Sequence, residues 1–515
     1  MTEYPADTVT ALLRKGASDA PAIGAPGRPR DRAWLTHGGL RNLVRLTVAD
    51  LNTMGIGRND RVALVLPNGP EAASSFVAIA CGATTAPLNP AYKAEEFSFY
   101  LTDLQAKALV VLAGMETSAR AVAADLGVPV VDLVPDADGP AGAFTLKPPP
   151  GLSGLAAHPG EAEAQDVALV LHTSGTTSRP KIVPLRHVNI TASAYHIAET
   201  LALTPDDVCL NIMPLFHIHG LIAATLSSLA AGAAVCCSPG FNAFRFFTWF
   251  SEARPTWYTA VPTMHQAILE LAPRNREAIE AGRLRFVRSS SSSMPGPVMT
   301  AIEKAFGVPL IEAYGMTEAS HQMASNPLPP RPRYPGCVGV AAGPEIAIMD
   351  QEGALLPPGA LGEVVIRGRN VTAGYENNPA ANASAFTNGW FRTGDQGVLD
   401  EAGYLRLTGR LKELINRGGE KISPLEVDEV LSDHPAVAQC LTFGMPHAKL
   451  GEEVAAAVVL RPGVTVRDTD LRDFCAGRLA AFKVPRKIVF LAEIPKGATG
   501  KLQRIGLAEK LGLTA

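Results

Sequence analysis

Residues 173–181 form a short segment whose composition suits it to binding phosphate groups. The segment reads Thr-Ser-Gly-Thr-Thr-Ser-Arg-Pro-Lys and follows an apolar run, residues 167–171, that is typical of a buried strand. Hydroxyl and amide groups donate hydrogen bonds to phosphate oxygens, and the cations Arg179 and Lys181 can neutralise phosphate charge. The Gly-Lys-Ser/Thr spacing of a Walker loop is missing. A flexible Ser/Thr turn is the alternative, but the density of donors favours a nucleotide-phosphate loop.

Four further motifs follow this loop. Residues 213–220 contain His217 and His219, and residues 285–288 lead into five consecutive serines. Residues 311–318 read Ile-Glu-Ala-Tyr-Gly-Met-Thr-Glu, and a Gly-Asp pair at 394–395 precedes a run that ends at Arg410. Each motif alone is a weak signal, because such short pairs occur by chance in a long chain.

The segments that must position these motifs alternate between strand-like and helical patterns. Residues 61–66, 108–112 and 128–131 are apolar and strand-like, and a helical stretch covers residues 71–81. This alternation predicts an α/β fold with parallel sheets and helical crossovers. We expect the Pro- and Gly-rich residues 135–160 to form a loop.

Composition excludes several classes of function. A chain of 515 residues is long enough for two or more domains, and its formal charge of −3 gives no reason to expect nucleic acid or an anionic membrane as partner. The seven cysteines include no Cys-x-x-Cys pair, which argues against zinc and disulfides. There is no targeting signal and no uninterrupted apolar run long enough to span a membrane. We therefore expect a soluble, cytoplasmic enzyme.

In order and spacing, the motifs together resemble the core motifs of the adenylate-forming superfamily, which includes acyl-CoA synthetases. The resemblance extends from about Asp60 to Arg504 and covers most of the chain. It implies a large N-terminal domain, residues 1–410, built from several subdomains with mixed and parallel sheets. It also implies a small, mobile α+β domain, residues 411–515.

The resemblance further implies an ATP site. The phosphates would be held by Thr173, Ser174, Gly175, Thr176, Thr177 and Lys181. Adenine would lie beside Tyr314, with Gly315 and Met316 adjacent and with Ser290, Ser291 and Ser292 over its other face. The ribose and phosphates would be contacted by Thr317, Asp395 and Arg410, and Glu318 would help to hold Mg²⁺. Without the resemblance, Asp395 would be interpreted as an ordinary carboxylate in a turn. Glu318 would be interpreted as a carboxylate at the start of a helix, where the helix dipole favours it. Two residues depart from the family pattern, since Ser178 and Ile182 stand where glycines are usual.

The implied reaction has two steps that use two orientations of the small domain. An acid and ATP give an acyl-adenylate, and a thiol then gives a thioester and AMP. Lys501, in a glycine-rich segment, would neutralise charge in the first step, and Lys412 would be the pivot of the hinge. Read alone, Lys501 is a solvated surface lysine. Because 14 residues follow Lys501, no carrier-protein domain is expected, and free CoA is the predicted thiol.

The acid is expected to be small and doubly anionic. The segments that form the family's acyl pocket here contain His217, His219, Arg288, Ser289 and His321 rather than apolar side chains. His219 could instead be structural, and a metal site of His217, His219 and His265 is disfavoured because no carboxylate or cysteine completes it. Four local sequences, 171–181, 214–220, 257–263 and 418–424, resemble the oxalate–CoA ligases within the superfamily.

Other functions stay open at this point. A ligase for malonate, sulfoacetate or an aryl acid is the runner-up. A non-catalytic nucleotide-binding protein of the same fold is less favoured, because Glu318, Asp395 and Lys501 are all present. A P-loop kinase or ATPase is disfavoured by the missing Walker spacing.

Overall fold

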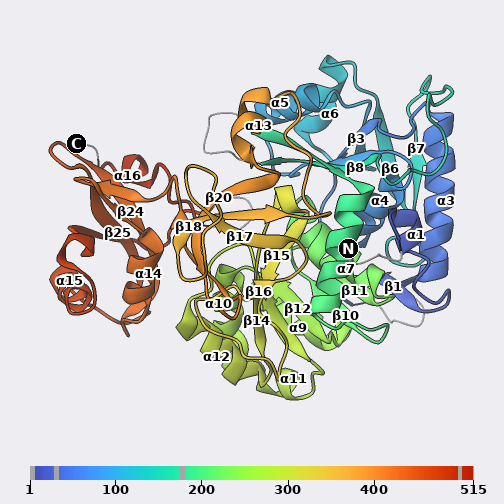
Figure 1. Cartoon of the computed structure of the whole chain (residues 1–515). Helices are drawn as coiled ribbons and strands as arrows, with labels where there is room; N and C mark the ends of the chain where they lie inside the picture. The colour runs from blue at the N-terminus through green and yellow to red at the C-terminus, as the bar shows by residue number, and fades with distance from the viewer. Residues whose placement is uncertain (1–5, 28–33, 174–179, 497–501, 514–515) are drawn as a thin grey trace.

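The structure, a computed structural model, describes residues 6–27, 34–173, 180–496 and 502–513. Within these ranges the strands form four sheets (Figure 1). Three sheets belong to the larger body of the molecule, and the fourth lies in a unit of its own at the C-terminal end. All seven cysteines are buried and none is in a disulfide.

The first large sheet ends at the predicted phosphate loop. Its strands are β3 (Arg61–Val65), β4 (Thr84–Pro87), β5 (Ala108–Leu112), β6 (Val130–Pro135), β7 (Phe144–Lys147), β8 (Val167–Thr173) and β9 (Lys181–Arg186). They lie in the order β7-β6-β5-β3-β4-β8-β9, with β7 and β9 antiparallel to their neighbours and the others parallel. Thr173 lies opposite Lys181, so the two ends of the predicted loop face each other across a hairpin.

The second large sheet carries most of the remaining motifs. Its strands are β1 (Pro21–Gly24), β2 (Leu35–Thr36), β10 (Val208–Asn211), β11 (Ala234–Cys237), β12 (Trp257–Ala260), β13 (Phe286–Ser289), β14 (Leu310–Met316), β15 (His321–Ser325) and β16 (Val340–Ala341). The order is β16-β15-β14-β13-β12-β10-β11-β1-β2, and the strands from β14 to β1 are parallel. Every residue of β10, β11, β12 and β13 is buried, as expected for parallel strands covered on both faces.

Helices connect these strands and cover the two sheets. They are α1 (Val9–Leu12), α3 (His37–Thr53), α4 (Pro70–Ala80), α5 (Ala94–Leu104), α6 (Ser118–Asp125), α7 (His187–Thr200), α8 (Ser227–Ala230), α9 (Ala243–Ala253), α10 (Pro262–Leu271), α11 (Arg276–Glu280) and α12 (Gly296–Phe306). A π-helix, η1 (His219–Leu226), precedes α8, and a short 3-10 turn, η2 (Ala272–Asn275), follows α10. No helix in the described ranges is long and apolar enough to cross a membrane.

A third, smaller sheet of antiparallel strands follows. It contains β17 (Glu345–Met349), β18 (Leu361–Arg367), β19 (Phe386–Thr387), β20 (Trp390–Leu399) and β21 (Leu405–Arg410), with the helix α13 (Pro379–Ala385) beside it. Strands β20 and β21 pair so that Asp395 lies opposite Arg410. The sequence motif that ends at Arg410 is therefore a hairpin.

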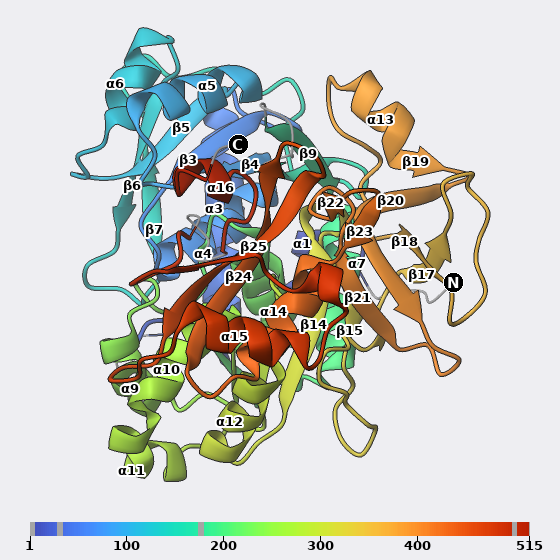
Figure 2. The ribbon, with the colours of Figure 1, turned by 90° about the vertical axis from the view of Figure 1, so that its left-hand side faces the viewer.

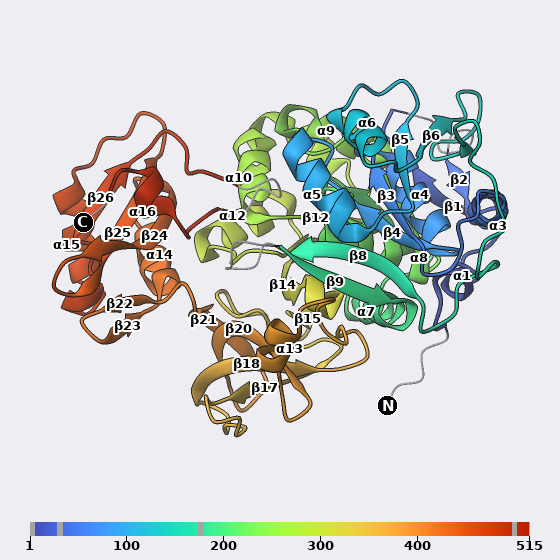
Figure 3. The same ribbon diagram turned by 90° about the horizontal axis from the view of Figure 1, so that it is seen from above.

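The fourth sheet forms the C-terminal unit. Its strands are β22 (Ile415–Arg417), β23 (Glu420–Ile422), β24 (Val437–His447), β25 (Gly451–Leu460) and β26 (Lys487–Phe490). The helices α14 (Pro424–Ser432), α15 (Asp468–Ala476) and α16 (Leu507–Lys510) and the turn η4 (Ala481–Lys483) complete it. The unit stands apart from the rest of the ribbon (Figures 1 and 3). In Figure 2 the molecule is turned so that this unit faces the viewer. Gln439 in β24 nevertheless donates to Gln266 in α10, 3.1 Å away.

The α/β class with mixed and parallel sheets and a separate C-terminal domain is confirmed. One local prediction was wrong: residues 135–160 are not entirely loop, because β7 lies within them and pairs with β6. The prolines and glycines around β7 indicated a loop, although the strand itself is a short edge strand whose side chains alternate between buried and exposed.

Candidate functional site

A buried cluster of polar side chains lies where three parallel strands end. Thr259 is near the end of β12, Arg288 near the end of β13, and Ser291 follows β13. His219 begins η1, which follows the loop after β10. Parallel strands bring their carboxyl ends to one edge of a sheet, and this edge is the usual place for a ligand site in α/β folds. The sequence placed His219 and Arg288 in one pocket, and the structure does bring them together.

His219 is the centre of this cluster. Its Nε2 is 2.6 Å from the Thr259 hydroxyl, its Nδ1 is 3.0 Å from the Ser291 hydroxyl, and its ring centroid is 5.0 Å from that of His321. One guanidinium nitrogen of Arg288 lies 3.5 Å from both His219 Nε2 and Thr259 Oγ1, and the other donates to Gln322 Oε1 at 3.2 Å. Thr259 and Gln322 were missed by sequence reasoning, because a buried Thr or Gln in a strand looks like core.

Arg288 is fully buried, and among the described residues no carboxylate forms an ion pair with it. Its Nε has no hydrogen-bond partner in this part of the chain. Burial lowers the pKa of Arg288 to about 9, so the guanidinium still carries its charge at neutral pH. A buried charge without a partner is costly. The site is therefore electrostatically suited to an anion.

His321 reaches the cluster through an unusual backbone. The turn η3 covers only Thr317–Ala319, and His321 begins β15 with φ at +103°, so Glu318 and His321 do not share a helix. Ser320 also has a positive φ of +51°. Such conformations are strained for residues other than glycine and collect at functional sites.

Gly315 makes room for this backbone. A Cβ atom on Gly315 would lie 1.7 Å from the carbonyl oxygen of His321. The space that Gly315 leaves is thus filled by the neighbouring strand β15, which is paired with β14. The glycine fixes the position of His321, a constraint that the sequence motif did not show.

A second cluster joins the second and third sheets. The Tyr314 hydroxyl donates to Asp395 Oδ2 at 2.5 Å, and Arg410 Nε lies 3.0 Å from Asp395 Oδ1. The Asp395 backbone N–H donates to the Thr393 hydroxyl at 3.0 Å. Three residues that the resemblance assigned to nucleotide binding are therefore in direct contact, although they are far apart in the sequence.

A third cluster links the predicted phosphate and metal residues. Glu318 is buried, and its Oε1 accepts a hydrogen bond of 2.9 Å from the Tyr375 hydroxyl. The Lys181 ammonium lies 4.3 Å from the centroid of the Tyr375 ring, a cation–π contact. Tyr375 was not predicted from the sequence; it lies in the loop before α13, where no motif marked it.

The other predicted residues fall into three groups. Ser289 and Ser290 are buried, and the Ser290 hydroxyl donates to the Ala313 carbonyl rather than being available for a ligand. His217, Ser291, Met316 and Thr317 are half-buried, and Ser292 is exposed. Ser174, Gly175, Thr176, Thr177 and Lys501 lie outside the described residues.

The segment that leads into the C-terminal unit is exposed at Lys412. The next residue, Glu413, accepts a hydrogen bond from Arg504, which also pairs with Asp428 at 2.9 Å. Gly418 and Gly419 have φ of +59° and +98° and close the β22–β23 hairpin, a two-residue turn that favours glycine at both positions.

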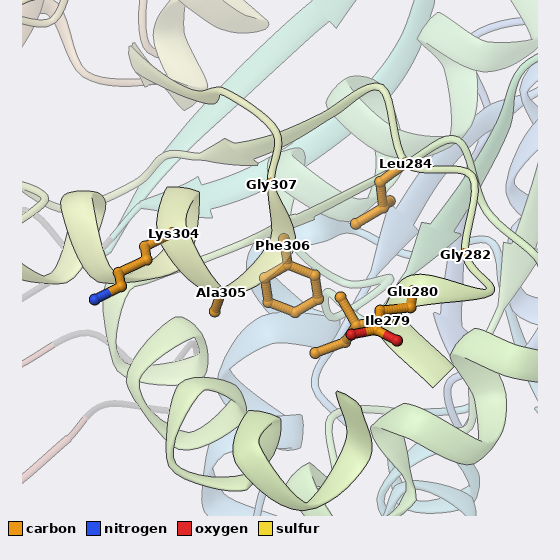
Figure 4. A pocket seen from close by; sticks show the side chains of 8 residues that line it. All are labelled: Ile279, Glu280, Gly282, Leu284, Lys304, Ala305, Phe306 and Gly307. Carbon is orange, nitrogen blue, oxygen red and sulfur yellow. The ribbon is translucent and has the colours of Figure 1, made fainter. Parts of the chain in front are cut away.

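A surface hollow of about 330 Å³ lies elsewhere, between the ends of α11 and α12 (Figure 4). It is lined by Ile279, Glu280, Gly282, Leu284, Lys304, Ala305, Phe306 and Gly307. None of the predicted site residues lines it, so this hollow is not the candidate site.

We expect Gly315→Ala to destabilise the protein by about 3 kcal/mol, because the new Cβ must push β15 away from β14. Thermal unfolding checks this. Gly296→Ala is the control, since its Cβ would meet Pro335 at an ordinary 3.6 Å. Equal melting temperatures for the two variants would contradict the close approach of His321 to Gly315.

The buried Glu312, in β14, leads us to expect that the stability of the folded protein depends on pH. Burial raises its pKa to about 8, against the lowering effect of the Met294 N–H that donates to Oε1. Because the folded pKa is above the usual value, this group's contribution is fully present below about pH 4.5 and is lost as pH rises through 8. Glu312→Gln should therefore gain in melting temperature relative to the parent as pH rises from 5 to 8. A difference that stays constant over this range would contradict a neutral, buried Glu312.

The comparisons with known proteins agree with this geometry. The family model described as AMP-binding enzyme matches residues 13–376, and that of its C-terminal domain matches residues 426–501. A relative named probable CoA ligase from Humulus lupulus is 47% identical over 98% of this chain and 96% of its own length. The oxalate–CoA ligase of Arabidopsis thaliana is 45% identical, covering 97% of each chain. The ATP-bound MatB of Rhodopseudomonas palustris has a TM-score of 0.87 at 30% identity, covering 98% of each chain. The resemblance to adenylate-forming enzymes is thereby confirmed, and the chain belongs to the AMP-binding enzyme family.

Proposed function

We propose that the protein is an ATP-dependent acid–CoA ligase that converts oxalate into oxalyl-CoA, with release of pyrophosphate and AMP. The observation that carries the choice of acid is the buried Arg288, whose charge no described carboxylate neutralises. The similarity to the Arabidopsis oxalate–CoA ligase over nearly the whole chain supports the same conclusion.

The polar cluster suits a small acid with two anionic groups. A fatty acid would need an apolar pocket, and its tail would leave the buried donors of this cluster without partners. Ser289, Ser291, His217, His219 and His321 are the residues that we assign to the acid. A second carboxylate would receive hydrogen bonds from this set and lie in the field of Arg288, so that the cost of burying both charges falls.

The nucleotide would lie between the two remaining clusters. We assign the ATP phosphates to residues 173–177 and Lys181, and the ribose to Asp395, whose oxygens can accept further hydrogen bonds beside those from Tyr314 and Arg410. Tyr314, Gly315, Met316, Ser290 and Ser292 would surround adenine, and Thr317 would donate to the α-phosphate. Ser291, which the resemblance places beside adenine, contacts His219 instead and is assigned to the acid.

Glu318 fits the role of a Mg²⁺ ligand. It is a buried carboxylate with one oxygen held by Tyr375, and Mg²⁺ commonly takes one or two protein carboxylates together with substrate phosphates. When bound, the ion would neutralise phosphate charge. The role of the protein is to orient Glu318 through the Tyr375 hydroxyl.

The acid itself would be the nucleophile of the first step, so no nucleophilic side chain is required. One carboxylate oxygen attacks the α-phosphorus, pyrophosphate leaves, and the CoA sulfur then displaces AMP from the acyl carbon. Lys501 and the positioning of the two substrates would lower the barrier of the first step. We divide the chain into domains 1–410 and 411–515, with Lys412 as the pivot just after the boundary. Rotation there would allow the small domain to present Lys501 or the 418–419 turn in alternation.

Sulfoacetate and malonate are the second candidates, since each also carries two anionic groups, and the second group could compensate the buried charge of Arg288. An aryl acid would leave Arg288 without an anion. A non-catalytic role is not favoured, because Glu318 and Asp395 are both held by hydrogen bonds in the described structure and Lys501 is present in the sequence.

AMP and pyrophosphate release should be measured with ATP, Mg²⁺ and CoA across oxalate, malonate, sulfoacetate, acetate, a medium-chain fatty acid and a cinnamate-type acid. We expect kcat/KM to be highest for oxalate. A preference for acetate, the fatty acid or the cinnamate-type acid would reject the dianion site, and absence of turnover with every acid would reject the ligase.

Tyr375→Phe should weaken the use of MgATP, because Glu318 loses the hydroxyl that orients it. We expect kcat/KM for MgATP to fall roughly tenfold, as for other partners of metal ligands, while KM for the acid changes little. Tyr404→Phe is the matched control, since its hydroxyl donates only to the Pro332 carbonyl in the described structure. If the two variants behave alike, Tyr375 has no part in nucleotide binding.

A further inference from the structure

Arg288 contacts the predicted acid site only through other side chains. Its guanidinium lies beside Thr259 Oγ1 and His219 Nε2, each 3.5 Å away, and Ser291 lies on the opposite side of the His219 ring, 3.0 Å from Nδ1. These four side chains form a chain of contacts that begins at a buried charge and ends at a half-buried hydroxyl.

The direction of each hydrogen bond in this chain follows from Arg288. A guanidinium has donors and no acceptor, so the oxygen and nitrogen that face it must accept. A proton on His219 Nε2 would point towards this cation, and Nε2 is therefore the acceptor of the Thr259 hydroxyl at 2.6 Å. The single proton of the neutral ring is then on Nδ1, which donates to Ser291 Oγ.

The hydroxyl of Ser291 is left with its own proton. Because its oxygen accepts from His219, the O–H can donate to an anion outside the chain of contacts. With the opposite tautomer, Nδ1 would accept, and the Ser291 proton would be used within the protein. Ser291 is also held with φ at +75°, a left-handed conformation that a serine rarely adopts without a constraint.

We propose that Arg288 is a positioning residue for substrate selection: it fixes His219 as the Nδ1–H tautomer and so dedicates the Ser291 hydroxyl to the second carboxylate of the acid. The inference rests on the proposed function, since it names how that site prefers a dianion. Arg288 also contributes through its charge without touching the acid, because the second negative charge compensates a cation that the described part of the protein leaves without an ion pair.

The kinetic test compares oxalate with oxamate, in which a neutral amide replaces one carboxylate in a molecule of nearly the same shape. In Arg288→Met, we expect the ratio of kcat/KM for oxalate over oxamate to fall by roughly tenfold or more, on the scale of a lost charge-assisted hydrogen bond. KM for ATP should stay within about twofold, and Arg288→Lys should restore part of the ratio, because it keeps a cation without the planar fork.

Melting temperatures of the ligand-free variants separate positioning from general support of the fold. Removing an unpaired buried charge should leave the melting temperature of Arg288→Met unchanged or raised. Arg367→Met is the control, because it removes an exposed arginine paired with Glu345 and should alter neither selectivity nor ATP use. An unchanged oxalate-to-oxamate ratio in Arg288→Met, or equal losses for both acids, would overturn the inference.

Nitrogen-15 NMR of histidine-labelled protein tests the tautomer without any substrate. At pH 7, His219 should give the shifts of a neutral ring with the proton on Nδ1, and Arg288→Met should shift the population away from this form. A proton on Nε2 in the parent protein, or no change in the variant, would overturn the inference. If the parent protein turns over neither oxalate nor another diacid, the proposed function fails, whereas the NMR result still decides the role of Arg288.

Discussion

A guanidinium held in the interior without an acidic partner is the constraint on which the candidate acid site depends. Arg288 lies on a fully buried strand between two others, so water cannot solvate it from either face of the sheet. Its neighbours Thr259, His219 and Gln322 offer oxygen and nitrogen acceptors but no negative charge. The fold tolerates this cost at one edge of the sheet, and such a local cost is typical of a site shaped for a ligand rather than for stability.

Two further contacts tie this edge to the rest of the molecule. The hydrogen bond between Tyr314 and Asp395 joins the second sheet to the third. Tyr375 contacts Lys181 of β9 through its ring and Glu318 through its hydroxyl. Each contact connects elements that are more than 50 residues apart in the sequence. The three sheets therefore meet around one region, which contains the groups that we assign to phosphate, ribose and acid.

The C-terminal unit has a different relationship to this region. Its core is separate from those of the large body, and its links to that body include a glutamine pair and the segment after β21. Arg504 fastens the end of the chain to Asp428 and to Glu413 beside the predicted hinge. A unit with its own core is suited to the rotation that we propose for the two-step reaction.

The sequence by itself determined the class of fold, the order of the motifs and the kinds of residue at each site. Strand and helix patterns are local, and motif spacing reflects chemistry that needs particular side chains, so both can be read without coordinates. Tertiary structure alone decided which side chains touch. The partners Thr259, Gln322 and Tyr375 carry no local signal, since a buried polar residue in a strand or loop looks like any other. Glu318 reads from the sequence as a carboxylate at the start of a helix, but the structure has only a short turn before β15. The missing Cβ atom of Gly315 allows the backbone of His321 to pair closely with β14. The absence of an ion-pair partner for Arg288 among the described residues is likewise a property of packing, because the sequence shows which charges are present but not the distances between them.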